Sequence, residues 1–64
     1  MTDFESLADD VAALEQRVSD AIFDLVRAQL RDENADEAHQ REKQLAKVRR
    51  SLQKAEQLLR GAAD

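Results

Sequence analysis

The sequence predicts an all-α protein: a two-helix antiparallel coiled-coil hairpin, which we expect to assemble into a four-helix bundle as a homodimer. Three observations favour this fold. Apolar or small residues recur at alternating spacings of three and four in each half of the chain, as in a coiled-coil seam. The two series mirror each other about the polar stretch 31–37. One Gly, no Pro and 38% charged residues are typical of helices.

The first helix is expected at about 3–31. Thr2 and Glu5 have the spacing of a capping box, in which the hydroxyl accepts from the backbone three residues on. Arg27 and Arg31 suit the negative end of the helix dipole. The seam positions of this helix are Phe4, Leu7, Val11, Leu14, Val18, Ala21, Leu25 and Ala28.

A turn is expected at about 32–35 and a second helix at about 35–60. Asn34 is the predicted cap, and Gly61 follows the last predicted turn, where glycine commonly ends helices. The seam positions of this helix are Ala38, Arg41, Leu45, Val48, Leu52, Ala55, Leu59 and Ala62.

Mirror symmetry predicts the register of the hairpin. Facing seam residues have numbers that add to 66, so Leu14 is expected to face Leu52, and the midpoint falls among the turn formers 32–34. The alternative is one continuous helix of about sixty residues in a long coiled coil. Its seam would contain His39, Glu42 and Arg49, which is a poor core, so the periodicity favours the hairpin.

Four apolar residues do not fit the predicted seam. Below about 70–80 residues a core usually needs extra support, and this 64-residue chain has no cysteine to supply a disulfide. Exposed apolar patches mark interfaces without naming the partner, so either a second copy or a different protein could cover the patch, and self-association is favoured. The predicted interface residues are Ile22, Phe23, Val26 and Leu30.

Charge is distributed unevenly along the chain. Residues 1–37 hold eleven acidic and three basic residues, whereas residues 38–64 hold seven basic and three acidic ones. A stripe on the second helix could follow a phosphate backbone, so a nucleic-acid-associated accessory subunit is an alternative function. A solvated exterior is favoured, because the net charge is −4 and no aromatic residue interrupts the stripe. The stripe consists of Lys43, Lys47, Arg50 and Lys54.

No catalytic, cofactor or metal site is expected. The chain lacks Cys, and its single Gly cannot form a glycine-rich phosphate loop. His39 lies one turn after Asp36 and three residues before Glu42, so a metal-binding helical bundle is a weaker alternative. We therefore expect a non-catalytic interaction or accessory module that acts through self-association and binding of a protein partner.

A cytoplasmic location and no contact with membrane are expected. No apolar run approaches the 18 residues of a membrane span, and the acidic residues near the N-terminus differ from the basic start of a signal peptide.

Two segments resemble small two-helix accessory subunits, such as that of bacterial exonuclease VII. The resemblance lies in Phe4-Glu5-Ser6-Leu7 with Val11 and Leu14-Glu15, and in Ala55-Glu56-Gln57-Leu58-Leu59. That family has a Gly-containing, Leu-rich turn where this chain has Asp32-Glu33-Asn34-Ala35. No functional residue is carried over from the resemblance.

Overall fold

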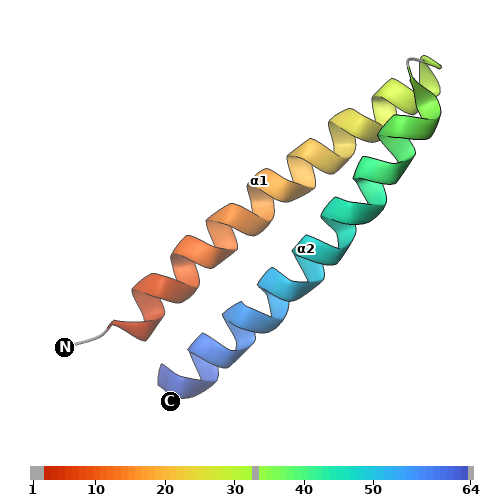
Figure 1. Ribbon diagram of the computed structural model, residues 1–64. Helices are drawn as coiled ribbons and strands as arrows, with labels where there is room; N and C mark the ends of the chain where they lie inside the picture. The colour runs from red at the N-terminus through yellow and green to blue at the C-terminus, as the bar shows by residue number, and fades with distance from the viewer. Residues whose placement is uncertain (1–2, 33, 64) are drawn as a thin grey trace.

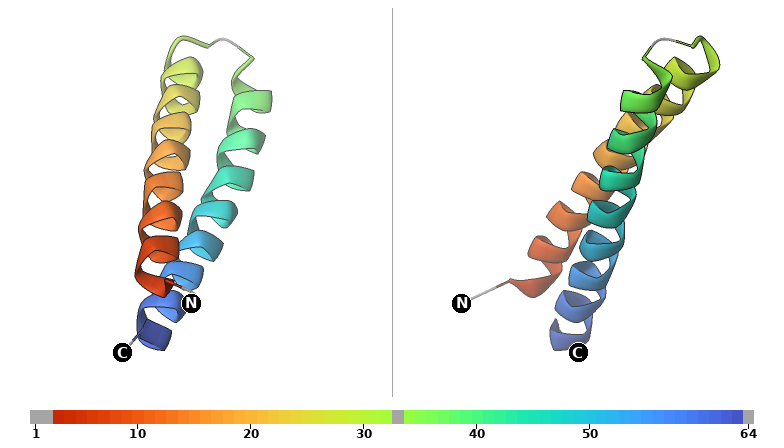
Figure 2. Two further views of the ribbon diagram at one scale, coloured as in Figure 1. Left: turned by 90° about the vertical axis from the view of Figure 1, so that its left-hand side faces the viewer. Right: turned by 45° about the vertical axis from the view of Figure 1, so that its right-hand side comes forward.

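Two antiparallel helices form a hairpin in the computed structural model, which describes residues 3–32 and 34–63. Helix α1 spans Phe4–Leu30 and α2 spans Ala35–Ala63 (Figure 1). The molecule is a rod of 49 × 14 × 13 Å, and further views show the two helices side by side along its length (Figure 2). The predicted helical hairpin is confirmed, and the single continuous helix is excluded.

Asp3 caps the start of α1. Its carboxylate accepts a hydrogen bond of 3.1 Å from the backbone N–H of Ser6, which satisfies one of the free donors of the first turn. The capping box predicted at Thr2 begins outside the described residues, and the capping side chain in the structure comes one residue later. At the other end the Arg31 amide donates to the Arg27 carbonyl at 3.1 Å.

The connection relies on two residues with left-handed backbone. Asp32 has φ 60° and Asn34 has φ 48°, and Asp and Asn tolerate this conformation better than most residues. The Asn34 carbonyl accepts from the Ala38 N–H at 2.9 Å, so α2 begins close to the predicted position. Gly61 does not end α2, because it lacks a positive φ and the helix continues to Ala63.

The helix contact follows the predicted seam on α2, where Ala38 is buried, and is rotated from the predicted seam on α1. Ala8 is completely buried, whereas Leu7 and Leu14 are each 43% exposed. Ile22 lies two heptads after Ala8 and is half-buried. The contact of α1 therefore includes both the stripe one residue after the predicted one and half-buried members of the predicted stripe such as Val18 and Leu25. Small Ala8 and Ala38, the most buried hydrophobic residues described, allow the two backbones to approach closely.

Polar side chains bridge this contact. The two residue numbers of each bridging pair add to 68–71, whereas the predicted register requires a sum of 66. The register is therefore shifted from the predicted one. Gln donors, carboxylates and guanidinium groups can pair across a contact that stays partly open to water, which makes polar residues acceptable there. The bridging hydrogen bonds are Gln29 to Glu42 at 2.7 Å, Arg49 to Ser19 at 3.5 Å and Arg60 to Asp9 at 3.2 Å.

Candidate interaction surface

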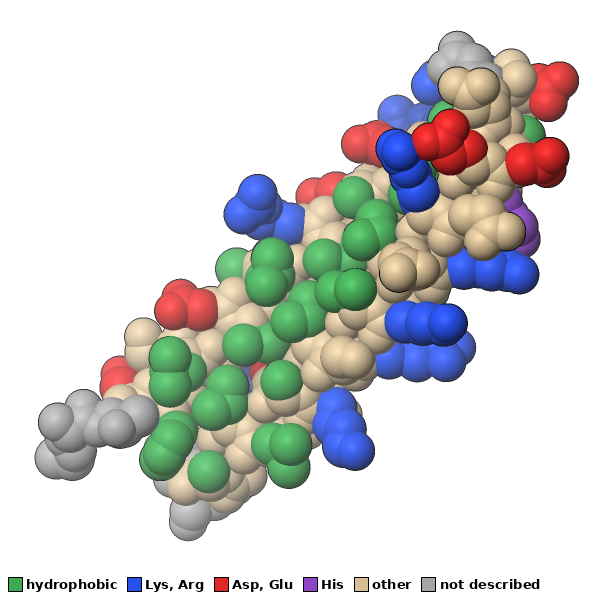
Figure 3. Space-filling view, in the orientation of Figure 1, with side chains coloured by type: hydrophobic (Ala, Val, Ile, Leu, Met, Phe, Trp, Pro, Cys, Tyr) green, Lys and Arg blue, Asp and Glu red, His purple; other side chains and the backbone are tan. Residues whose placement is uncertain are grey.

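Part of the predicted seam borders an open surface, which we call the apolar face. Leu7, Leu14 and Val48 are exposed there. Other large seam residues, such as Leu25 and Leu52, are half-buried between the helix contact and the solvent. Figure 3 shows hydrophobic side chains along both helices on the side that faces the viewer. We define the apolar face as Leu7, Leu14, Ala21 and Leu25 of α1 with Leu45, Val48, Leu52 and Ala55 of α2.

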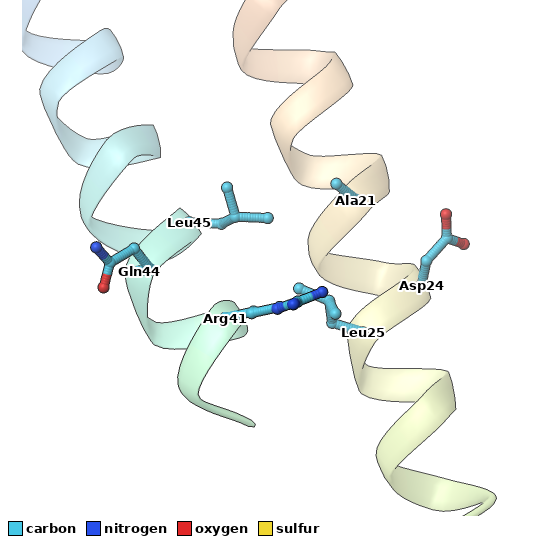
Figure 4. A pocket seen from close by; sticks show the side chains of 6 residues that line it. All are labelled: Ala21, Asp24, Leu25, Arg41, Gln44 and Leu45. Carbon is cyan, nitrogen blue, oxygen red and sulfur yellow. The ribbon is translucent and has the colours of Figure 1, made fainter. Parts of the chain in front are cut away.

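Two hollows interrupt the apolar face. The first has a volume of about 410 Å³ and lies near the turn, between Ala21 and Leu25 of α1 and Leu45 of α2. These three side chains point into the space between the helices, and Asp24 and Gln44 lie at its rim (Figure 4). The second hollow, of about 470 Å³, follows α2 along residues 44–55. Both hollows could receive apolar side chains from another helical surface.

One cation lies at the turn end of the apolar face. Arg41 extends across the first hollow toward Leu25 in Figure 4. Its guanidinium is 2.7 Å from a carboxylate oxygen of Glu37, one helical turn earlier, and both side chains are more than half exposed. The spacing of four residues is typical of helix ion pairs and could have indicated this pair from the sequence. Arg41 thus gives the apolar face a charged end.

The four predicted interface residues do not share one open surface. Ile22 and Val26 are half-buried beside the helix contact. Phe23 is 66% exposed and Leu30 is 82% exposed. Phe23 follows Leu14 by nine residues, or about two and a half turns, so it lies on the opposite side of α1 from the apolar face. The predicted hairpin core also includes residues that are exposed in the structure, namely Leu7, Leu14 and Val48.

Two carboxyl groups meet inside the helix contact. Hydrogen bonding to Glu56 raises the pKa of Glu15, and loss of hydration and the charge of Glu56 raise it further, while Arg60 opposes the shift. The same hydrogen bond and the Arg60 guanidinium, 2.8 Å away, lower the pKa of Glu56. One Glu15 oxygen is buried with no hydrogen-bond partner among the described residues. The pKa of Glu15 thus lies above that of Glu56.

The basic stripe of α2 is exposed at Lys43, Lys47, Arg50 and Lys54. Three of these side chains line a shallow hollow of about 280 Å³ together with Gln40 and Gln44. Figure 3 shows Lys and Arg side chains projecting from the outer edge of α2, away from the hydrophobic band. The stripe thus borders the apolar face at Lys47, which also lines the second hollow.

The metal alternative has no assembled ligand set. The Nδ1 atom of His39 is 3.7 Å from a Glu42 oxygen, and that oxygen also accepts from Gln29. Within residues 3–32 and 34–63 there is no group of three His, Cys, Asp or Glu residues arranged to hold a metal ion. Among the same residues, neither helix has the length and apolar character needed to cross a membrane.

No protein-family model, curated protein or solved structure matches the chain.

Proposed function

We propose that this protein is a non-catalytic helical interaction module that acts through self-association and through binding of a protein partner. In the proposed homodimer, two hairpins cover each other's apolar face and form a four-helix bundle. The observation that supports the proposal is the open apolar face, which extends over both helices (Figure 3). A non-catalytic role accords with side-chain chemistry that consists of ion pairs and hydrogen bonds along a rod.

The energetics of the isolated hairpin favour such a contact. No large side chain is fully buried among the described residues. Burying a Leu or Val side chain completely contributes about 1.5–3 kcal/mol, and Leu7, Leu14 and Val48 each keep more than 40% of their surface in water. A small fold of this kind usually needs added support. A second apolar surface would supply it.

The length of the rod suits a second copy of the chain. A whole side of 49 by 14 Å has an area of about 700 Å², so two hairpins in contact along their full length would bury about 1,400 Å², within the range of about 1,200–2,000 Å² for stable interfaces. A second hairpin has the same length and can cover the apolar face completely. Residues at alternating spacings of three and four then line the shared core of a four-helix bundle.

Sedimentation equilibrium of two matched variants tests the proposal. We expect the wild-type protein to be a dimer and Leu14→Glu to be mainly monomeric, because the new carboxylate would lie unpaired in the interface. Phe23→Glu adds the same charge on the opposite side of α1 and should remain dimeric. A wild-type protein that is a folded monomer at micromolar concentration would contradict self-association.

The same pair of variants separates the two candidate interfaces. Dissociation by Phe23→Glu but not by Leu14→Glu would move the interface to the residues predicted from the sequence, Ile22, Phe23, Val26 and Leu30. Circular dichroism of each variant checks that the helices are retained.

A further inference from the structure

We infer that the two hairpins of the dimer pack with their turns at the same end, so that each α1 lies against α2 of the second copy. This inference rests on the proposed self-association through the apolar face. A two-fold axis lying in the interface permits two alignments. An axis parallel to the rod places the turns at the same end, with α1 against α2. An axis across the rod places the turns at opposite ends, with α1 against α1 and α2 against α2.

The charges of the two helices favour the same-end alignment. Helix α1 holds six acidic and two basic residues, and α2 holds four acidic and seven basic residues. The formal net charges are therefore −4 for α1 and +3 for α2. With the turns at the same end, each α1 of the four-helix bundle has an α2 on both sides, which is the electrostatically complementary arrangement. With the turns at opposite ends, each helix faces a helix of its own sign in the second copy.

Acidic groups at the α1 rim of the apolar face point to the same alignment. Asp10 and Asp24 lie three residues after Leu7 and Ala21, which belong to the apolar face, so both carboxylates lie on its flank. Asp24 is seen at the rim of the first hollow (Figure 4). Opposite-end packing would bring Asp10 of one copy close to Asp24 of the other, because the two residues lie about equally far from the middle of the α1 face. The dimer would contain this repulsive contact twice.

Basic groups lie at the α2 rim. Lys47 lines the second hollow, and Lys54 follows it by two helical turns on the same flank. The bridging pairs have residue numbers that add to 68–71, so Asp24 is level with residues 44–47 of α2. A two-fold axis parallel to the rod keeps the second copy at the same height. Same-end packing therefore brings Asp24 of one copy close to Lys47 of the other, whereas opposite-end packing would bring Lys47 close to Lys54.

Arg41 can be accommodated in the same-end alignment. The two copies of Arg41 then lie at one height but on diagonally opposite helices, whose axes are about 11–14 Å apart when neighbouring axes are about 8–10 Å apart. Each guanidinium is 2.7 Å from a carboxylate oxygen of its own Glu37, which offsets the repulsion between the two copies.

Cross-linking of single-cysteine variants tests the alignment, because the natural chain has no Cys. Arg17 lies on the α1 rim, seven residues after Asp10. Ser51 lines the second hollow at the α2 rim, and its number adds to 68 with that of Arg17, as in the bridging pair of Ser19 and Arg49, so the two positions lie at the same height. A mixture of Arg17→Cys and Ser51→Cys, refolded together and treated with a short bismaleimide, should give covalent heterodimer.

Each variant alone is the matched control. With the turns at the same end, the two copies of either rim position lie on opposite sides of the bundle, so each variant alone should stay mainly uncoupled. Mass spectrometry identifies the products. Covalent homodimers of Arg17→Cys and of Ser51→Cys in place of the heterodimer are expected for turns at opposite ends, and this result would overturn the inference.

Charge reversal at Asp24 gives a second readout. Asp24→Lys should raise the dissociation constant of the dimer about tenfold, because it places a new cation beside Lys47 in each of two contacts. Asp20→Lys, the matched control, reverses an exposed charge on the side of α1 away from the apolar face and should change the constant little. Tighter association of Asp24→Lys than of Asp20→Lys is the result expected when Asp24 faces Asp10, and it would contradict same-end packing. A monomeric wild-type protein would overturn the proposed self-association itself, so the two failures are distinguishable.

Discussion

At the scale of single residues, the Glu15–Glu56 pair makes the stability of the hairpin depend on pH. A carboxyl group whose pKa is raised in the folded state stabilises that state when it is protonated. The contribution of Glu15 is therefore complete below its ordinary pKa of 4.5 and is lost as pH rises through the raised value. Glu56 has the opposite sign, because its pKa is lowered. Its contribution is present above 4.5 and is lost as pH falls through the lowered value.

Replacing Glu15 by Gln should stabilise the protein at pH 7. The amide of the Glu15→Gln variant can donate a hydrogen bond to Glu56 at every pH and carries no charge. It therefore replaces the protonated form of Glu15 over the whole pH range. We expect a higher melting temperature at pH 7 and a weaker fall in stability as pH rises from 4.5. Thermal unfolding followed by circular dichroism between pH 4 and pH 8 measures both effects.

Asp10→Asn is the matched control for this change. It also removes one negative charge from α1, but Asp10 is exposed rather than located inside the helix contact. Its stability should follow the wild-type dependence on pH. Equal stabilisation by the two substitutions would show that the general negative charge, rather than the Glu15–Glu56 contact, limits stability.

At the scale of the helix, a shift of one residue decides which side chains of α1 contact α2. Ile22 belongs to the stripe of Ala8 and is half-buried, while its neighbour Phe23 is 66% exposed. Ile22→Ala should therefore destabilise the hairpin, and Phe23→Ala should change stability little. Replacing a fully buried Ile by Ala usually lowers the free energy of unfolding by about 2–5 kcal/mol. For half-buried Ile22 we expect a decrease of about 1–2 kcal/mol.

Urea unfolding of both alanine variants at one protein concentration measures the difference. Phe23→Ala should stay within about 0.5 kcal/mol of the wild-type protein, as surface substitutions usually do. A loss at Phe23 equal to that at Ile22 would mean that another surface covers Phe23, and this result would support the interface predicted from the sequence.

At the scale of the whole molecule, the basic stripe is expected to act as solvated exterior. Replacing Lys43, Lys47, Arg50 and Lys54 by Gln should leave helix content and dimerisation nearly unchanged, because exposed charges contribute little each. An electrophoretic mobility assay with generic DNA and RNA at low salt compares nucleic-acid binding by the wild-type and substituted proteins. A shift produced by the wild-type protein and abolished in the substituted protein would favour a nucleic-acid-associated subunit, since phosphate contacts account for most salt-dependent binding.

The sequence by itself determined the number of helices and the approximate position of the turn. Alternating spacings of three and four require helices, and the polar stretch with Asp32 and Asn34 accepts the backbone conformations of a tight connection. These are local properties, readable from propensity and periodicity. The sequence also predicted Ile22, Phe23, Val26 and Leu30 as one interface, and the structure divided them between the contact and the solvent.

Only the tertiary structure decided which stripe of α1 lies at the centre of the contact with α2. Both stripes of α1 have coiled-coil spacing: Leu7, Leu14 and Ala21 in one, and Ala8, Glu15 and Ile22 in the next. Periodicity favours the more apolar stripe as the hairpin core. In the structure, the small side chain of Ala8 and bridging pairs such as Gln29–Glu42 favour the other. Close approach of two backbones depends on side-chain size and on pairing across the contact, and neither is encoded in the spacing of apolar residues along one helix.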